Sequence, residues 1–181
     1  MFIYSLQNTQ LKLWKYIMIR IEKQYIEKID RETLKTFPDM KYDKVDNFFS
    51  PIVIEQSIIG TLDLVALETH SSVTINKCII NTLYLNFCWF RQGLDFSGNM
   101  ITNDAVYEAG VHNQMPFIMK DNVFQGFMDF FDCQFDAEVH VTGNIFLKGT
   151  NLLGNKGQGW ENTFNSHTII ENNYGILDVS E

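Results

Sequence analysis

One short spacing rule recurs along most of this chain and constrains its fold more than any other feature. An apolar residue is followed three positions later by a small or amide residue, and two positions after that by a second apolar residue. Val141, Asn144 and Phe146 form one of seven such units. This spacing is too close for an amphipathic helix and is interrupted too often for a long alternating strand. We therefore expect very short strands separated by bends.

The units themselves are spaced regularly. Their first residues lie 10 to 12 positions apart, so that two units make a period of about 21 to 22 residues, which is typical of a solenoid. In a stack of coils, equivalent residues lie about 4.8 Å apart, and the inward residues form ladders. Three apolar ladders are predicted: Ile54, Ile75, Phe96, Met119, Val141; Leu64, Leu85, Tyr107, Phe130, Leu152; and Ile59, Ile80, Ile101, Phe124, Phe146.

The small and amide positions form ladders as well. One consists of Ser57, Cys78, Asn99, Asn122 and Asn144, and a less regular one of Leu67, Cys88, Gly110, Cys133 and Asn155. Stacked Asn side chains hydrogen-bond to one another from coil to coil, which satisfies polar groups that would otherwise be buried without partners. These asparagines are therefore interpreted as scaffold residues. Ile169, Asn172 and Tyr174 repeat the spacing after a gap and indicate a final coil.

The segment from residue 121 to 146 resembles the degenerate branch of the pentapeptide-repeat proteins, in which an inward Phe or Leu follows a small residue by two positions. Asn122 before Phe124 and Cys133 before Phe135 match that pair. The resemblance covers residues 50 to 153 and implies a right-handed quadrilateral β-helix, in line with the usual hand of parallel crossovers. We therefore expect an all-β, right-handed parallel β-helix of about five to six coils.

The ends of a solenoid expose strand edges that natural proteins cover. Residues 12–37 place Ile17, Ile21, Tyr25 and Ile29 at helical spacing, Asp30 could cap a helix, and Pro38 would stop it. This pattern predicts an N-terminal helical cap. A strand in which Ile17, Ile19 and Ile21 alternate is the competing interpretation. The expected organisation is cap and lead-in over residues 1–48, and β-helix over 49–181 with inserted loops near 102–116 and 154–167.

Charge is distributed unevenly along the chain. The net charge is −8, made up of +2 in residues 1–50 and −10 in residues 51–181. An acidic solenoid is a poor binder of nucleic-acid phosphates, because like charges repel. It suits a basic protein partner, or it could mimic DNA. A hydrophobic content of 45% over 181 residues is enough for one domain with a continuous core.

The three cysteines, Cys78, Cys88 and Cys133, fall at inward small positions of the repeat. They are expected to be buried thiols, not a disulfide framework or a metal site. The sequence has no apolar run of membrane-spanning length and no convincing secretory signal, so we expect a cytoplasmic protein that is not inserted in a membrane. Met18 is an alternative to Met1 as the native start.

Several outward residues are candidates for chemistry or binding. Trp89 should point outward beside Arg91, as a contact residue would. Trp160 lies in the long glycine-containing loop and could cap the last coil or anchor a partner. Asp129, Asp132, Asp136 and Glu138 should face water on one coil, where a carboxylate pair could act in glycoside cleavage. The candidate binding residues are Trp89, Arg91, Asp129, Asp132, Asp136, Glu138 and Trp160.

No catalytic residue, metal site or cofactor is predicted. His70, His112 and His167 share one edge, but they lack the short ligand spacing of a zinc site. We expect a non-catalytic scaffold that binds a protein partner or a second copy of itself in a homodimer. The resemblance offers an alternative, an acidic DNA mimic of the gyrase-protecting type. A carbohydrate-active enzyme is a second alternative, by analogy of fold alone.

Overall fold

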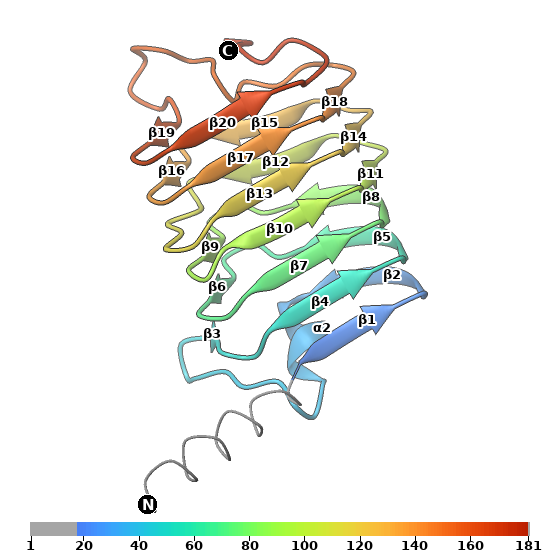
Figure 1. The fold of residues 1–181 in the computed structure, drawn as a ribbon. Helices are drawn as coiled ribbons and strands as arrows, with labels where there is room; N and C mark the ends of the chain where they lie inside the picture. The colour runs from blue at the N-terminus through green and yellow to red at the C-terminus, as the bar shows by residue number, and fades with distance from the viewer. Residues whose placement is uncertain (1–17, 181) are drawn as a thin grey trace, which may run out of the picture.

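A computed structural model describes residues 18–180 of the chain as a parallel β-solenoid, shown in Figure 1. About five regular turns lie between a first coil, which a short helix interrupts, and an incomplete last coil. One broad side is a seven-stranded parallel sheet, here sheet A, with one strand from each coil. Its strands are β1 (Ile19–Glu22), β4 (Ile52–Glu55), β7 (Val73–Asn76), β10 (Leu94–Ser97), β13 (Phe117–Lys120), β17 (Val139–Thr142) and β20 (Thr168–Glu171).

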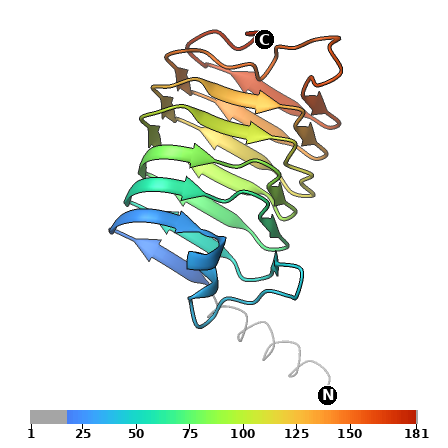
Figure 2. The ribbon, with the colours of Figure 1, turned by 180° about the vertical axis from the view of Figure 1, so that it is seen from behind.

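The second sheet covers the opposite broad side, seen from behind in Figure 2, and one narrow side. In the first three coils one bent strand serves both sides: β2 (Tyr25–Asp30), β5 (Ile58–Asp63) and β8 (Ile79–Tyr84). Later coils use separate strands. On the narrow side these are β11 (Met100–Ile101), β14 (Val123–Phe124) and β18 (Ile145–Phe146); on the broad side they are β12 (Ala105–Glu108) and β15 (Met128–Phe131).

The other narrow side is built from two-residue strands: β3 (Asn47–Phe48), β6 (Glu68–Thr69), β9 (Trp89–Phe90), β16 (Gln134–Phe135) and β19 (Thr163–Phe164). Val111 connects them, since it forms parallel bridges with both Trp89 and Gln134. Each regular coil therefore has four sides, two broad and two narrow. The short apolar units of the sequence correspond to these sides, because each side is long enough for only one or two inward residues.

The chain turns sharply where each strand of sheet A ends. One residue there has a positive φ in every coil: Lys23, Gln56, Lys77, Gly98, Asp121, Gly143 and Asn172. This left-handed conformation is the one that glycine adopts without a steric penalty. In the second to sixth coils the next residue is the small or amide member of the unit, and it points into the interior; in the first coil the next residue is the exposed Gln24.

The ladders predicted from the sequence are present. Ile54 pairs with Ile75, and the same register continues to Val141. Asn99, Asn122 and Asn144 are at most 2% exposed. The Asn122 side-chain oxygen accepts from the Asn99 backbone N–H at 2.9 Å and from the Asn99 amide at 3.1 Å, and the same contacts recur between Asn144 and Asn122. The amide ladder is thus confirmed as part of the core.

The predicted N-terminal helical cap is wrong for the residues that the structure describes. Between residues 18 and 180 the only helix is α2 (Arg31–Lys35), which Asp30 caps by accepting from the Thr33 N–H at 2.8 Å. The competing strand interpretation holds, since Ile19 and Ile21 pair with Ile52 and Ile54. A strand forms here instead of a helix because β4 provides an edge with which it can pair, and this pairing buries both isoleucines. The part of the helix prediction that falls on residues 1–17 lies outside the described residues.

The pairing therefore begins at Ile19, earlier than the expected boundary at residue 49. The irregular stretches also differ from the expected ranges: the first is shorter, and the second begins earlier. Most of the first inserted loop is residues 109–116, because β12 occupies part of the expected range. The second lies between the end of β18 and β19.

Two of the positions predicted for the last coils are wrong. Val141 pairs with Ile170 and not with Ile169, so the amide ladder continues at Asn173 while Asn172 occupies the corner with positive φ. On the opposite side the Cys133 N–H donates to the side chain of Asn162 at 2.9 Å, where Asn155 was expected. Both errors come from the long loop before β19, because its length does not show at which residue the strands of the last coil begin to pair.

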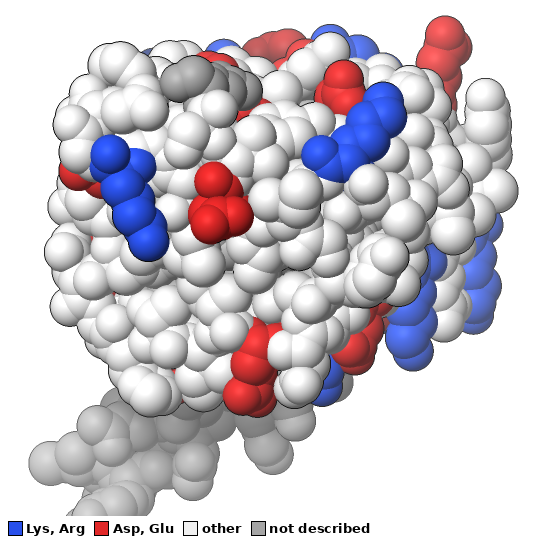
Figure 3. Space-filling model, turned by 90° about the horizontal axis from the view of Figure 1, so that it is seen from above, with Lys and Arg blue, Asp and Glu red and all other residues white. Residues whose placement is uncertain are grey.

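The last coil has no coil above it. Phe164 and Ile170 are partly exposed, although Phe135 and Val141, at the same positions one coil earlier, are 0% exposed. Viewed from this end, the surface is mostly uncharged, with separate acidic and basic side chains (Figure 3).

Candidate functional site

A cluster of polar and aromatic side chains lies on the narrow side formed by β6, β9 and β16. We call it the Trp89 cluster; it consists of Glu68, His70, Trp89, Arg91, His112 and Asp136. Glu68 and Trp89 point outward because the next residue of each two-residue strand points into the core. The remaining members follow the inward residue, at the corner where the chain enters sheet A.

Arg91 contacts three other members of the cluster: Glu68, Trp89 and His112. Its Nε lies 3.0 Å from Oε1 of Glu68, and its guanidinium carbon lies 4.5 Å from the centre of the Trp89 ring. Its Nη1 also donates to the backbone oxygen of His112 at 3.4 Å. These contacts connect neighbouring coils and hold the arginine over the indole, an arrangement that a cation–π attraction stabilises.

His112 and Asp136 continue the cluster into the next coils. The His112 ring meets the Trp89 ring edge-on at 5.0 Å, and its Nδ1 lies 3.1 Å from Oδ2 of Asp136. Burial opposes ionisation of Asp136, but hydrogen bonds from Gln134, Asn165 and His112 outweigh it and hold the pKa of this carboxyl below its ordinary value. Asp136 is therefore a charged hydrogen-bond acceptor, not an acid that holds a proton near neutral pH.

Three of the predicted binding residues, Trp89, Arg91 and Asp136, thus come together. The other four lie elsewhere. Asp129 is on β15 and accepts from the Asn151 amide at 2.7 Å, and Asp132 occupies the corner after β15. Glu138 contacts His140 at 2.8 Å at the start of sheet A. Asp129, Asp136 and Glu138 therefore each contact a different partner, and Asp132 lies at a corner of the coil.

Trp160 packs on the solenoid. Its ring stacks on Phe131 with the centroids 6.0 Å apart, and its backbone oxygen accepts from the Asp132 N–H at 3.0 Å. The side chain remains 39% exposed. Capping the last coil and anchoring a partner both remain predictions for Trp160.

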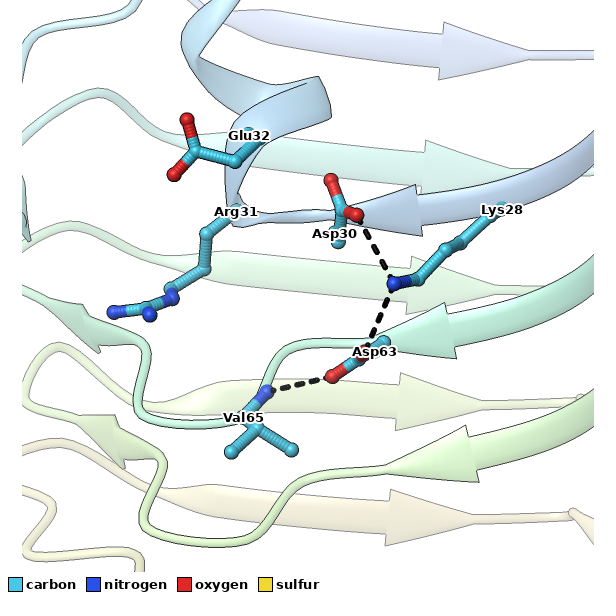
Figure 4. Close-up of a pocket in the computed structure, with 6 residues that line it drawn as sticks. All are labelled: Lys28, Asp30, Arg31, Glu32, Asp63 and Val65. Atoms are coloured by element: carbon cyan, nitrogen blue, oxygen red, sulfur yellow. Dashed lines mark hydrogen bonds and ion pairs between the residues drawn. The ribbon is translucent and has the colours of Figure 1, made fainter.

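A pocket of about 250 Å³ lies beside α2 and is lined by Lys28, Asp30, Arg31, Glu32, Asp63 and Val65 (Figure 4). Nζ of Lys28 lies 3.1 Å from a carboxylate oxygen of both Asp30 and Asp63. Hydrogen bonds from the backbone and side chain of Thr33, and then Lys28, lower the pKa of Asp30 to about 2. Glycoside cleavage needs one carboxylic acid with a raised pKa, and Asp30 does not fit that role because its pKa is lowered. Its evident role is to fasten the first coil to the second.

The cysteines lie inside the solenoid, as predicted. The Cys88 thiol donates to the Leu64 oxygen at 2.7 Å, and the Cys133 thiol donates to the Tyr107 oxygen at 2.9 Å. Burial raises the pKa of both thiols far above the ordinary value. Cys78 is 1% exposed, and burial raises its pKa as well. All three are free thiols.

Within residues 18–180, His, Cys, Asp and Glu side chains form no group of three or more that could hold a metal ion. In the same part of the chain, no helix has the length and apolar character of a membrane span.

An exposed apolar row on the opposite narrow side was not foreseen. It consists of Tyr25, Ile58, Ile79, Met100, Val123, Ile145 and Tyr174. The signal was present in the sequence: in each unit on that side, the residue between the small member and the second apolar member is itself apolar. The repeat frame itself specifies only the inward residues, so it does not predict this outward row.

Comparison of the chain with protein-family models, with curated proteins and with solved structures finds no match.

Proposed function

We propose that this protein is a non-catalytic scaffold that binds a protein partner through the Trp89 cluster. The observation that carries the proposal is the packing of Trp89 between Arg91 and His112 on a rigid coil. Trp and Arg are the residue types that most often dominate binding energy at protein interfaces. Because contacts to neighbouring coils already fix these side chains, a partner would lose little affinity to ordering them.

An electrostatic match favours a partner with basic groups. Glu68 and Asp136 flank the Trp89–Arg91 pair and are partly exposed, with side-chain exposures of 26% and 37%. Residues 51–181 carry a net charge of −10. The partner expected at this surface is a protein that presents lysine or arginine around an apolar contact for the indole.

The pentapeptide-repeat resemblance, and with it the right-handed winding, remains part of the proposal. The DNA-mimic alternative is less favoured, because its carboxylates would have to form a continuous row. On the second broad side the outward row reads Asp30, Asp63, Tyr84, Val106 and Asp129, so that an aromatic and an aliphatic residue interrupt the acids. A carbohydrate-active enzyme is favoured still less, given the dispersed carboxylates.

The test is a capture experiment that compares three versions of the full chain on a solid support, using extract of the source organism. They are the wild type, a Trp89→Ala/Arg91→Ala double variant, and a Lys44→Ala control on an exposed loop. A polypeptide retained by the wild type and the control, and lost by the double variant, is then purified and titrated calorimetrically. We expect at least tenfold weaker binding to the double variant, as for loss of a hot spot.

Circular dichroism of the double variant checks that its fold is retained. Equal binding by all three versions would contradict the proposal. A partner that duplex DNA displaces would support the mimic, and hydrolysis in a polysaccharide screen would support the enzyme.

A further inference from the structure

The apolar row on the narrow side of β11, β14 and β18 runs the whole length of the solenoid. These strands lie one above another on the right of Figure 1. Register places one member of the row in each coil, from Tyr25 in the first to Tyr174 in the last. Seven members at about 4.8 Å spacing span roughly 29 Å. An exposed apolar strip of this length is unusual for a surface that faces only water.

The row is large enough to form an interface. Six of its members, together with the neighbouring Leu147, are between 37% and 77% exposed: Tyr25, Ile58, Ile79, Met100, Ile145, Leu147 and Tyr174. With about 200 Å² for a fully exposed side chain of this size, they present on the order of 700 Å². A stable protein interface of ordinary size buries about 800 Å² on each partner.

The order of residues along the row is symmetric about its centre. Met100 is the middle member, with Ile79 and Val123 on either side. The next pair outward is Ile58 and Ile145, and the ends are two tyrosines, Tyr25 and Tyr174. A row with this order presents nearly the same sequence of side chains in both directions. Such self-complementarity is what a twofold interface requires.

We propose that this row docks against the same row of a second copy of the chain, with the two solenoids antiparallel. The twofold axis lies in the plane of the contact, crosses the solenoid axes at right angles and passes by Met100. Each tyrosine then meets the tyrosine at the opposite end of the second copy, and Ile58 meets Ile145. The proposal goes beyond the proposed function and uses a different surface, so that either can fail without the other.

The residues beside the row fit this arrangement. On the corner toward sheet A, Lys77 lies one coil before the centre and Asp121 one coil after it, and both are exposed. In the antiparallel pair Lys77 faces Asp121 of the second copy, and twofold symmetry creates that contact twice. A parallel pair would not bring these two charges together.

On the other side of the row, a position without a side chain would meet a large side chain of the second copy. Gly60 lies beside Ile58, and the exposed Leu147 lies beside Ile145. In the antiparallel pair Leu147 therefore faces Gly60 of the second copy, where no side chain competes for the space. Gly60 is also required within its own chain, since a Cβ there would lie 2.4 Å from the Glu27 oxygen.

The association state of the full chain tests the proposal, measured by sedimentation equilibrium from about 1 to about 100 µM, the range of moderate protein affinities. We expect the wild type to reach twice the chain mass of 21.1 kDa. Ile79→Glu should abolish the dimer in this range, because it places two charges inside the contact. A Lys44→Glu control, with the same change of charge as Lys77→Glu, should behave as the wild type.

Charge reversal distinguishes the antiparallel arrangement from others. Lys77→Glu and Asp121→Lys should each raise the dissociation constant roughly tenfold, because a contact made twice becomes repulsive. The double variant should return to within about threefold of the wild type.

A monomeric wild type, or a dimer insensitive to Ile79→Glu, would overturn the proposal. Equal weakening by the single and double variants would overturn the antiparallel pairing. A monomer whose Met100→Cys variant resists a thiol reagent would show that another part of the chain, such as residues 1–17, covers the row.

Discussion

Replacing Asn122 by alanine is expected to be among the most costly single changes in this fold. Its side chain makes four interactions: the oxygen accepts from the backbone and amide of Asn99, and the amide donates to the Phe96 oxygen at 2.8 Å and to the Asn144 side chain at 2.9 Å. Asn122→Ala leaves the buried Asn99 N–H without its acceptor and the Phe96 oxygen without this donor. Each unsatisfied group costs about 1 to 3 kcal/mol, and the substitution also leaves a small cavity. We therefore expect the free energy of unfolding to fall by ~3 to 5 kcal/mol.

Two further variants make this prediction specific. Ser57 occupies the equivalent position two coils before Asn99, and its hydroxyl accepts from the Gln24 N–H at 3.2 Å. Asn122→Ser should therefore restore one acceptor and lose roughly half as much stability. Asn103→Ala removes an exposed amide contact to Asn81 and should change stability by no more than ~0.5 kcal/mol.

Urea unfolding followed by circular dichroism measures all three variants against the wild type. The order of stability expected is Asn103→Ala, then Asn122→Ser, then Asn122→Ala. If Asn122→Ala costs less than ~1 kcal/mol, the amide ladder is not the buried network inferred here.

Three further predictions concern the core and the first coil. Phe124→Ala should lose ~3 to 5 kcal/mol in the same urea assay, because its ring stacks on Phe146 with the centroids 5.0 Å apart; a loss typical of surface sites would contradict this packing. Cys78, Cys88 and Cys133 should react with a thiol reagent only after denaturant is added, so that rapid labelling of the native protein would refute their burial. The pKa of Asp30 is lowered from 3.8 to about 2, so the ionised carboxylate stabilises the fold above pH 4, and this stabilisation is lost as the pH falls toward 2. The Asp30→Asn variant should therefore lose less folding stability than the wild type on acidification. Equal losses in the two proteins would count against the helix cap.

The repeated spacing predicted the solenoid and the register of its central coils, because each unit carries its own inward residues. The first coil was harder to predict. Ile21 and Tyr25 satisfy a helical spacing, while Ile19 and Ile21 satisfy a strand, and only the presence of β4 as a neighbour decides between them. Local propensity does not contain that information.

The candidate site was predicted in part for a similar reason. The alternation of side chains along the strand predicts that Trp89 points outward. Arg91 could be grouped with it because the two residues are close in the sequence. The contacts with Glu68, His112 and Asp136 span neighbouring coils and depend on the exact residue count of each coil. The acidic residues were grouped by sequence proximity, although the corner after β15 separates them.

Cross-linking at Met100 tests most directly the claim that the outer surface of this solenoid is built for association. The native thiols are buried, so the Met100→Cys variant has a single accessible cysteine among the described residues. A short bis-maleimide should join two copies of this variant efficiently. Ile58→Cys and Ile145→Cys should cross-link poorly alone and well when mixed, because the antiparallel pair brings position 58 of one copy to position 145 of the other. Efficient cross-linking of Ile58→Cys with itself, or none in the mixture, would contradict the account.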